Sequence, residues 1–123
     1  MLLSVVTIAK NDLPGLIATR ESVERQDVPP LQHIIVDGAS TDGTISWLEA
    51  LESRRSAAPE VTIRSAEDSG IYNAMNRGLQ LVSPKASHIL LLNAGDELAD
   101  PSTLAHIDAH LKKAGSQWCF GKS

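Results

Sequence analysis

The chain has 123 residues, of which 42% are hydrophobic and 21% are charged, and its formal net charge is −4. This length fits a single domain, and the lack of a basic stripe argues against nucleic acid as a partner. No apolar stretch approaches the roughly 20 residues of a membrane span, and the single cysteine suits a reducing compartment, so we expect a cytoplasmic protein.

The first third of the chain predicts two strands joined by a helix. The apolar run Leu2–Ala9 is typical of a strand. Asp12 and Pro14 suit the cap and the first turn of a helix, which we expect to end at Val28-Pro29-Pro30. A second apolar run predicts a strand at Gln32–Asp37.

The middle of the chain continues this alternation. We expect a second helix, capped by Asp42 or Thr41, and then a third strand at Val61–Arg64. Apolar residues from Ile71 to Val82 recur with a period near 3.6, which predicts a third helix.

The last part of the chain predicts two more strands around a fourth helix. The run His88–Leu92 is almost continuously apolar, as expected of a strand that is covered on both faces. Asp100 and Pro101 suit the cap and first turn of the helix that follows, and Gly115 suits its end. A final strand is predicted at Trp118–Phe120.

Strands that alternate with helices in this way predict an α/β fold with a mostly parallel sheet. Each of the first four strands is followed by an acid or an acid-rich turn, and carboxyl ends of parallel strands meet at one edge. An acidic rim would repel a phosphate, but it would hold a divalent cation, which could then hold a diphosphate. The pattern therefore indicates a metal-bridged nucleotide ligand.

Three sequence segments carry most of the evidence for such a ligand site. In Val36–Thr44, a strand-end Asp37 could accept hydrogen bonds from a base or sugar, whereas Asp42 alone is better explained as a helix cap. In Glu67–Gly78, a glycine inside a helical pattern costs about 1 kcal/mol, which indicates that a strand or a ligand approaches Gly78 closely. In Leu92–Glu97, Asp96 follows the most apolar strand and could ligate a divalent metal that also binds phosphate.

Taken together, these segments resemble the inverting family-2 glycosyltransferases with a GT-A fold, of the bacterial exopolysaccharide and colanic-acid type. The resemblance covers nearly the whole chain. It rests on Ser4–Asp12, Ile35–Thr44, Asp68–Gly78 and Leu91–Asp96. It implies a Rossmann-like three-layer sandwich with strand order 3-2-1-4 plus a last strand, in which Asn11 and Asp96 face each other across the crevice between the first and fourth strands.

The resemblance also implies ligands and residue roles. The donor would be a UDP- or GDP-sugar, the cofactor Mn or Mg, and the acceptor a saccharide or a lipid-linked molecule. Asp96 would bind the metal, because it matches the last acid of the family's DxD-type motif. The nucleotide would be bound by Ala9, Asn11, Asp37, Ser40, Asp68 and Asn76.

The chain departs from the family pattern in two respects. Asn93 and Gly95 stand where the usual metal motif carries further acids. The family's catalytic base and acceptor pocket follow the metal motif, and no residue here can be assigned as that base. We therefore expect residues 1–123 to form one nucleotide-sugar-binding domain that lacks the C-terminal acceptor half.

Two alternatives remain open at this stage. The chain could be a truncated nucleotide-binding module without catalysis, or it could be a nucleotidyltransferase, although the latter normally carries a Gly-rich basic loop after the first strand. A sheet that stops at its last strand would expose apolar surface, so self-association is a further expectation, as is peripheral association with the inner face of a membrane.

Overall fold

The computed structural model describes residues 2–54, 60–67, 71–114 and 118–120. Within these ranges, strands and helices alternate in the predicted order. The strands are β1 (Leu3–Ala9), β2 (Gln32–Asp37), β3 (Val61–Ser65), β4 (His88–Leu91) and β5 (Trp118–Phe120). The helices are α1 (Leu13–Glu24), α2 (Thr44–Ser53), α3 (Ile71–Gln80) and α4 (Thr103–Ala114).

The strands form one parallel sheet in the order β3-β2-β1-β4-β5, which confirms the predicted order 3-2-1-4 plus a last strand. The register places Ala9 of β1 beside Asp37 of β2, and Asp37 beside Ser65 of β3. The carboxyl ends of these three strands are therefore level with one another. This alignment brings the loops that follow them to the same edge of the sheet.

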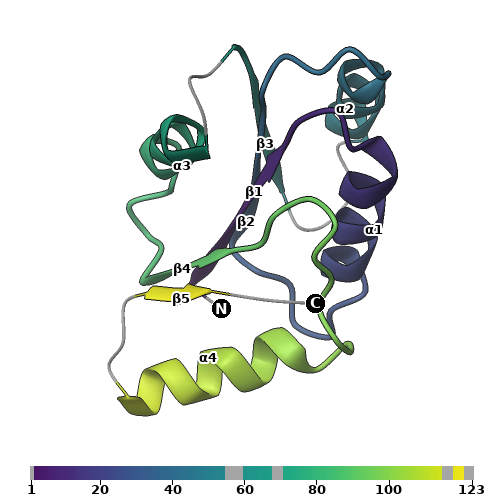
Figure 1. Cartoon of the computed structure of the whole chain (residues 1–123). Coiled ribbons are helices and arrows are strands. Elements are labelled where there is room, and N and C mark those ends of the chain that lie inside the picture. Colours follow the sequence, from purple (N-terminus) through teal and green to yellow (C-terminus); the bar gives the residue numbers. More distant parts are fainter. Residues whose placement is uncertain (1, 55–59, 68–70, 115–117, 121–123) are drawn as a thin grey trace.

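Helices cover the sheet on both sides, with α3 on one side and α1 and α2 on the other (Figure 1). On the α3 side, a Cβ atom added to Gly78 would lie 2.7 Å from Cγ1 of Val6 and 3.3 Å from Cγ2 of Val36. The close approach predicted at Gly78 is therefore made by the neighbouring strands. The three layers form the α/β sandwich that the sequence predicts.

Apolar side chains fill both faces of the sheet, because alternate residues of a strand point to opposite sides. On the α3 face, the buried core consists of Val6, Ile34, Val36, Ala74 and Leu91. On the other face, one cluster contains Leu3, Val5, Val23, Leu90, Leu92, Leu98 and Leu104, and a second contains Ala9, Leu16, Ile35, Leu48 and Leu51. Burial on both faces explains why the runs of β1, β2 and β4 are almost continuously apolar.

The helix ends differ in detail from the predictions. Asp12 caps α1 as predicted, and its side chain accepts a hydrogen bond from the backbone N–H of Gly15. The N-cap of α2 is Gly43, in a left-handed conformation with φ of 96°, rather than Asp42 or Thr41. The prediction was wrong by one or two positions because a residue without Cβ adopts that conformation most easily.

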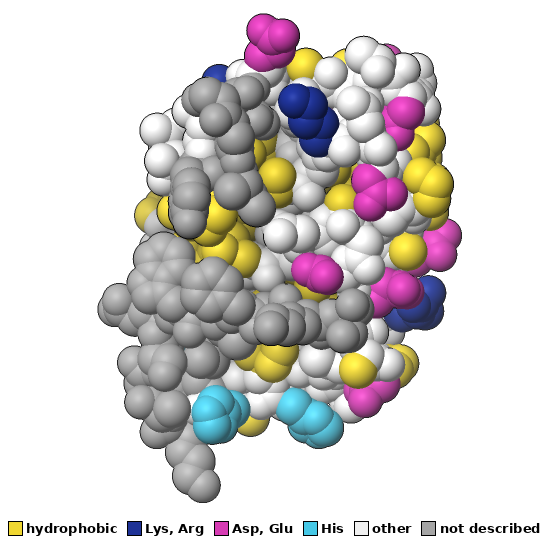
Figure 2. Space-filling view, in the orientation of Figure 1, with side chains coloured by type: hydrophobic (Ala, Val, Ile, Leu, Met, Phe, Trp, Pro, Cys, Tyr) yellow, Lys and Arg dark blue, Asp and Glu magenta, His cyan; other side chains and the backbone are white. Residues whose placement is uncertain are grey.

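Acidic side chains are spread over the face shown in Figure 2 rather than gathered in one place. Large hydrophobic side chains that are exposed include Leu2, Val28 and Ile45. Among the described residues, no helix is both long and apolar enough to cross a membrane.

Candidate functional site

The loops after β1, β2 and β4 meet at the carboxyl edge of the sheet. Hydrogen bonds to β1 continue past the last residue of β4, because the N–H of Ala94 donates to the carbonyl of Ile8 at 3.0 Å. Gly38 N–H likewise donates to the carbonyl of Ala9 at 2.9 Å. The structure thus brings together four of the predicted site residues, Ala9, Asn11, Asp37 and Ser40, with the turn that carries Asp96. Asp68 lies outside the described residues.

Asp37 is fully buried, and its carboxylate is held by two serines. Oδ2 accepts from the backbone N–H of Ser40 at 3.0 Å and from the hydroxyl of Ser65 at 2.9 Å. Oδ1 accepts a short hydrogen bond from the hydroxyl of Ser40. These contacts join the end of β2 to the end of β3 and shape the loop after β2. The predicted contact of Asp37 with a base stays a prediction, and it requires the base to reach a carboxylate that is fully buried.

Asn11 connects the loop after β1 to the loop after β2. Its N–H donates to the hydroxyl of Ser40 at 2.8 Å, and its side-chain Oδ1 accepts from the N–H of Thr41 at 2.8 Å. Asn11 and Ala39 both have left-handed backbones, with φ of 50° and 58°. Asn tolerates this conformation, whereas for alanine it is strained, and such strain concentrates at binding sites. The two loops therefore form one interlocked unit at the sheet edge.

Asp42 has a structural role next to the start of α2, although it is not the N-cap that the sequence predicted. Its Oδ2 accepts from the N–H of Leu13, the first residue of α1, at 3.0 Å. Its Oδ1 accepts from the N–H of Thr44, the first residue of α2, at 3.2 Å. The hydrogen bond from the Thr44 hydroxyl is the main reason why the pKa of Asp42 lies below its ordinary value. Asp42 thus joins the N-termini of α1 and α2.

Asp96 closes a tight turn after β4. Its N–H donates to the carbonyl of Asn93 at 2.9 Å, and its Oδ2 accepts from the N–H of Asn93 at 3.2 Å. Gly95 has a left-handed φ of 98°, and a Cβ added there would lie 3.6 Å from Oδ2 of Asp12. A carboxylate from the loop after β1 therefore lies next to this turn, on the other side of the β1–β4 crevice.

The donor set at this turn suits a hard cation only in part. In the described part of the chain, Oδ1 of Asp96 makes no hydrogen bond, and carboxylate oxygen is the atom that Mg²⁺ and Mn²⁺ prefer. The described residues contain no group of three or more His, Cys, Asp or Glu side chains that could hold a metal. Asp96 can thus supply one ligand, with water or the diphosphate of a donor as further ligands.

The structure does not bring Asn76 to the other predicted site residues. Ala74 and Gly78 are buried against the sheet, and each is two positions, or about 200°, away from Asn76 on the helix. Asn76 is accordingly exposed on the side of α3 that faces away from the sheet. On another side of α3, Oδ1 of Asn73 and Nη1 of Arg77 are buried and have no hydrogen-bond partner among the residues that the structure describes.

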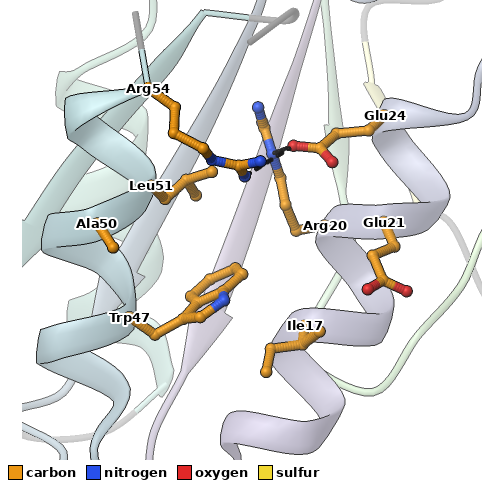
Figure 3. Close-up of a pocket in the computed structure, with 8 residues that line it drawn as sticks. All are labelled: Ile17, Arg20, Glu21, Glu24, Trp47, Ala50, Leu51 and Arg54. Atoms are coloured by element: carbon orange, nitrogen blue, oxygen red, sulfur yellow. Dashed lines mark hydrogen bonds and ion pairs between the residues drawn. The ribbon is translucent and has the colours of Figure 1, made fainter.

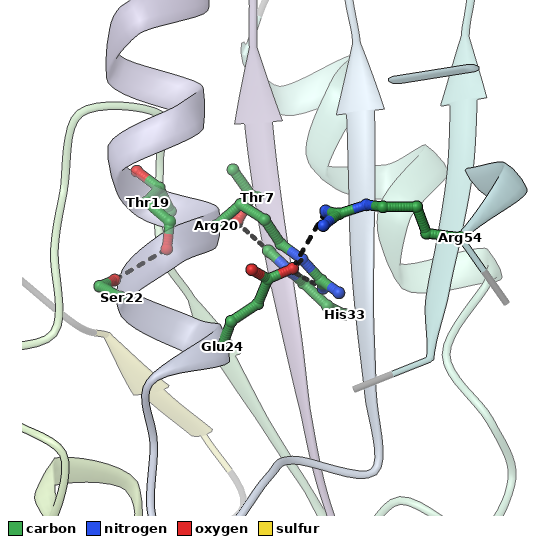
Figure 4. A network of polar contacts seen from close by, with 7 residues as sticks. All are labelled: Thr7, Thr19, Arg20, Ser22, Glu24, His33 and Arg54. Carbon is green, nitrogen blue, oxygen red and sulfur yellow. Dashed lines mark hydrogen bonds and ion pairs between the residues drawn. The ribbon is translucent and has the colours of Figure 1, made fainter. Parts of the chain in front are cut away.

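A buried polar network lies under α1, away from this edge (Figure 4). Nη1 of Arg20 donates to Nδ1 of His33 at 3.0 Å, so the other ring nitrogen, Nε2, carries the proton and donates to the hydroxyl of Thr7 at 2.8 Å. Nε of Arg20 donates to Glu24 at 2.8 Å, and Glu24 also pairs with Arg54 at 3.4 Å. Burial lowers the pKa of Arg20, and burial together with the charge of Arg20 lowers that of His33 to about 3.

A cavity of about 220 Å³ adjoins this network, between α1 and α2 (Figure 3). Its lining comes from the middle and later parts of the two helices and from the residue after α2, and consists of Ile17, Arg20, Glu21, Glu24, Trp47, Ala50, Leu51 and Arg54. Both helices begin at the carboxyl edge of the sheet and run back toward the amino edge. The cavity is therefore separate from the site that the loops form.

Comparisons with known proteins agree with one another. The sequence model described as Glycosyl transferase family 2 matches residues 4–121. An uncharacterized glycosyltransferase of Mycobacterium tuberculosis is 32% identical over 123 residues, which cover 96% of this chain and 44% of that protein. A PGL/p-HBAD biosynthesis glycosyltransferase of Mycobacterium bovis is 31% identical over 108 residues, which cover 88% of this chain and 41% of that protein. The chain thus spans less than half the length of these curated relatives.

Solved structures of glycosyltransferases share the fold. The mannosyltransferase PcManGT from Pyrobaculum calidifontis, in complex with GDP-Man and Mn²⁺, superposes with a TM-score of 0.79 at 23% identity. That match covers 89% of this chain and 32% of the mannosyltransferase. TarS 1-349 of S. aureus, in complex with UDP-GlcNAc, gives a TM-score of 0.78 at 21% identity, covering 94% of this chain and 32% of TarS. These likenesses show that the chain has the GT-A fold.

Proposed function

The chain belongs to glycosyl transferase family 2, and from that membership we propose that it binds a nucleotide-diphospho-sugar donor for transfer of the sugar to an acceptor hydroxyl with inversion. One observation carries this proposal. The family match covers residues 4–121, and the loops that carry Asn11, Ser40 and Asp96 meet at the carboxyl edge of one parallel sheet. Open α/β sheets bind ligands at that edge.

The donor is proposed to be a UDP- or GDP-sugar. PcManGT is solved with GDP-Man and TarS with UDP-GlcNAc, and both share this fold. The interlocked loops of Asn11 and Ser40, together with Ala9 and Asp37, form the proposed nucleoside end of the site. Asp68 completes the proposed nucleotide-binding set, whereas Asn76, exposed on the side of α3 that faces away from the sheet, is no longer part of it.

A divalent cation, Mn²⁺ or Mg²⁺, is proposed to bind at Asp96. Its Oδ1 makes no hydrogen bond in the described part of the chain, and the carboxylate of Asp12 lies beside the same turn. When bound, such a cation would neutralise charge on the diphosphate leaving group. Asn93 and Gly95 supply no carboxylate, so we expect a weaker site than one built from several acids.

Inversion would require a base that deprotonates the acceptor hydroxyl as it attacks. None of the described residues is assigned this role. A nucleotide-binding module without transfer therefore stays a second candidate, because the relatives are more than twice as long as the matched region. We also propose that the acceptor is a saccharide or a lipid-linked molecule and that the transferase is of the exopolysaccharide type. Its proposed location is the cytoplasm, at the inner face of a membrane.

Calorimetric titration of UDP and GDP into the chain, with and without Mn²⁺, tests the proposal. We expect one nucleotide to bind more tightly with Mn²⁺. Asp96→Asn removes the carboxylate charge and should reduce that gain by at least about tenfold, because it removes the one proposed protein ligand of the metal. The control is Asp27→Asn, an exposed acid beyond the end of α1, which should leave both titrations unchanged.

Two results would contradict the proposal in different ways. If neither nucleotide binds, the family membership describes ancestry rather than a donor site in this chain. If a nucleotide binds equally well with and without Mn²⁺, the donor site stands and the metal role of Asp96 is wrong.

A further inference from the structure

The buried face of α1 carries a row of polar side chains that holds the segment after β4. Thr19 and Ser22 are spaced at i and i+3 and lie on one side of α1, and Gln26 follows two positions after the end of the helix. All three are buried, and Thr19 is fully so. Each bonds to backbone groups more than 70 positions further along the chain, between residues 93 and 104.

Ser22 and Gln26 hold the later part of that segment. The hydroxyl of Ser22 accepts from the N–H of Leu98 at 3.2 Å. The amide of Gln26 donates to the carbonyl of Asp100 at 2.8 Å and accepts from the N–H of Leu104 at 2.9 Å. These contacts fix the segment between the turn of Asp96 and α4, beginning two positions after Asp96.

Thr19 holds the turn of Asp96 itself. Its hydroxyl accepts from the N–H of Gly95 at 3.0 Å and lies 2.6 Å from the carbonyl of Asp96, to which it can donate. The carbonyls of Gly15 and Asn93, at 3.0 and 3.3 Å, are more distant acceptors for the same proton. Thr19 therefore holds the backbone of the turn at Gly95 and at Asp96, and so it fixes the position from which the carboxylate of Asp96 extends.

We propose that Thr19 is a positioning residue, which holds the Asp96 carboxylate in the direction needed to bind a divalent cation beside the donor diphosphate. This inference rests on the proposed metal role of Asp96. Gly95 makes such support necessary, because a glycine in a turn leaves the backbone free to move when its hydrogen bonds are lost. A residue that orients a metal ligand through a hydrogen bond commonly changes metal affinity by about 10- to 100-fold when it is replaced.

The test compares three variants of the chain. Thr19→Val keeps the shape and removes the hydroxyl, Thr19→Ser keeps the hydroxyl, and Ser22→Ala removes a neighbouring hydroxyl that bonds to Leu98 instead. The first readout is the affinity for UDP and GDP with and without Mn²⁺. The second is amide hydrogen exchange at Gly95 and at Leu98, which reports the local stability of each contact.

We expect Thr19→Val to reduce the Mn²⁺-dependent gain in affinity by about tenfold or more, while Thr19→Ser restores it to within about twofold. Exchange at Gly95 should accelerate in Thr19→Val, and exchange at Leu98 should accelerate in Ser22→Ala. Ser22→Ala should keep the Mn²⁺-dependent gain, because it leaves the turn of Asp96 in place.

Three results would overturn the proposal. If Thr19→Val keeps the Mn²⁺-dependent gain of the parent chain, Thr19 does not position Asp96. If Thr19→Val and Ser22→Ala weaken binding equally with and without Mn²⁺, the whole row on α1 is merely structural. If Mn²⁺ does not raise the nucleotide affinity of the parent chain, Asp96 does not bind a metal, and the proposed role of Thr19 is then wrong as well.

Discussion

At the scale of the residue, His33 shows how burial sets the charge state of a side chain. The ring is fully buried on β2, between the guanidinium of Arg20 and the hydroxyl of Thr7. Removal from water disfavours the charged imidazolium, and the nearby positive charge of Arg20 disfavours it further, so the pKa falls to about 3. The folded protein therefore keeps His33 neutral throughout the physiological range.

This neutral histidine predicts a loss of stability in mild acid. The unfolded chain binds a proton at His33 near pH 6.5, whereas the folded chain does so only near pH 3. Between these values the unfolded state binds more protons, so the free energy of unfolding falls as the pH is lowered, by up to about 1.4 kcal/mol per pH unit. Above pH 6.5 the contribution is complete. Urea unfolding at pH 5, 6 and 7 measures this slope.

His33→Gln separates this histidine from other titrating groups. Glutamine can accept from Arg20 and donate to Thr7 without taking up a proton. The free energy of unfolding should therefore change less between pH 5 and 7 in His33→Gln than in the parent chain. His110→Gln, at an exposed position on α4, is the matched control and should keep the parent slope. Parallel slopes for the parent and His33→Gln would contradict the assignment.

At the scale of the element, α3 packs unusually close to the sheet. Ala74 and Gly78 are one turn apart and face β1 and β2, where Val6 and Val36 occupy the surface. The sequence already indicated a close approach at Gly78, since glycine inside a helix costs about 1 kcal/mol. It left open whether a strand or a ligand was the neighbour, because a pattern along one helix carries no information about what covers it.

Gly78→Ala should destabilise the protein although alanine favours a helix. The new Cβ would lie 2.7 Å from Cγ1 of Val6, and overpacking of this kind costs about 1 to 3 kcal/mol, against a gain in helix propensity of about 1 kcal/mol. Denaturant unfolding measures the difference. Combining Gly78→Ala with Val6→Ala removes the clashing methyl group, so the pair should be less damaging than the sum of the single changes. A more stable Gly78→Ala chain would show that the helix can shift away.

At the scale of the whole molecule, the net charge of the chain affects its affinity for a charged ligand. The chain has a formal net charge of −4, and its proposed donor carries a negative diphosphate. Without a divalent cation the two repel each other. That repulsion extends over a Debye length, which shrinks from about 30 Å at 0.01 M salt to about 3 Å at 1 M.

Nucleotide binding without metal should therefore strengthen as salt is added. Between about 0.01 M and 1 M NaCl, we expect the affinity for UDP or GDP to rise about threefold in the presence of EDTA, since screening weakens the repulsion. With saturating Mn²⁺ the rise should be smaller or reversed. Titrations at several salt concentrations measure both trends, and a metal-free affinity that falls with salt would indicate that local basic groups dominate the site.

The sequence by itself determined the fold class, because apolar periods and capping residues are local signals. The segments at the strand ends indicated the family, and the order of the strands followed only from that resemblance. It placed β2 and β5 at their observed bounds, but it predicted Asp42 or Thr41 as the N-cap of α2, where the structure has Gly43. It identified Asn11, Asp37, Ser40 and Asp96 as residues of the carboxyl edge, since parallel strands bring their ends together.

Only the tertiary structure decided how these residues are held. Asp37 is enclosed by Ser40 and Ser65, Asn76 faces away from the sheet, and the turn of Asp96 depends on Thr19. No local pattern reveals such contacts, because a hydrogen bond between residues more than 70 positions apart leaves no period or spacing in the sequence. A buried threonine in a helix has the same sequence signature whether it fills space or orients a binding residue.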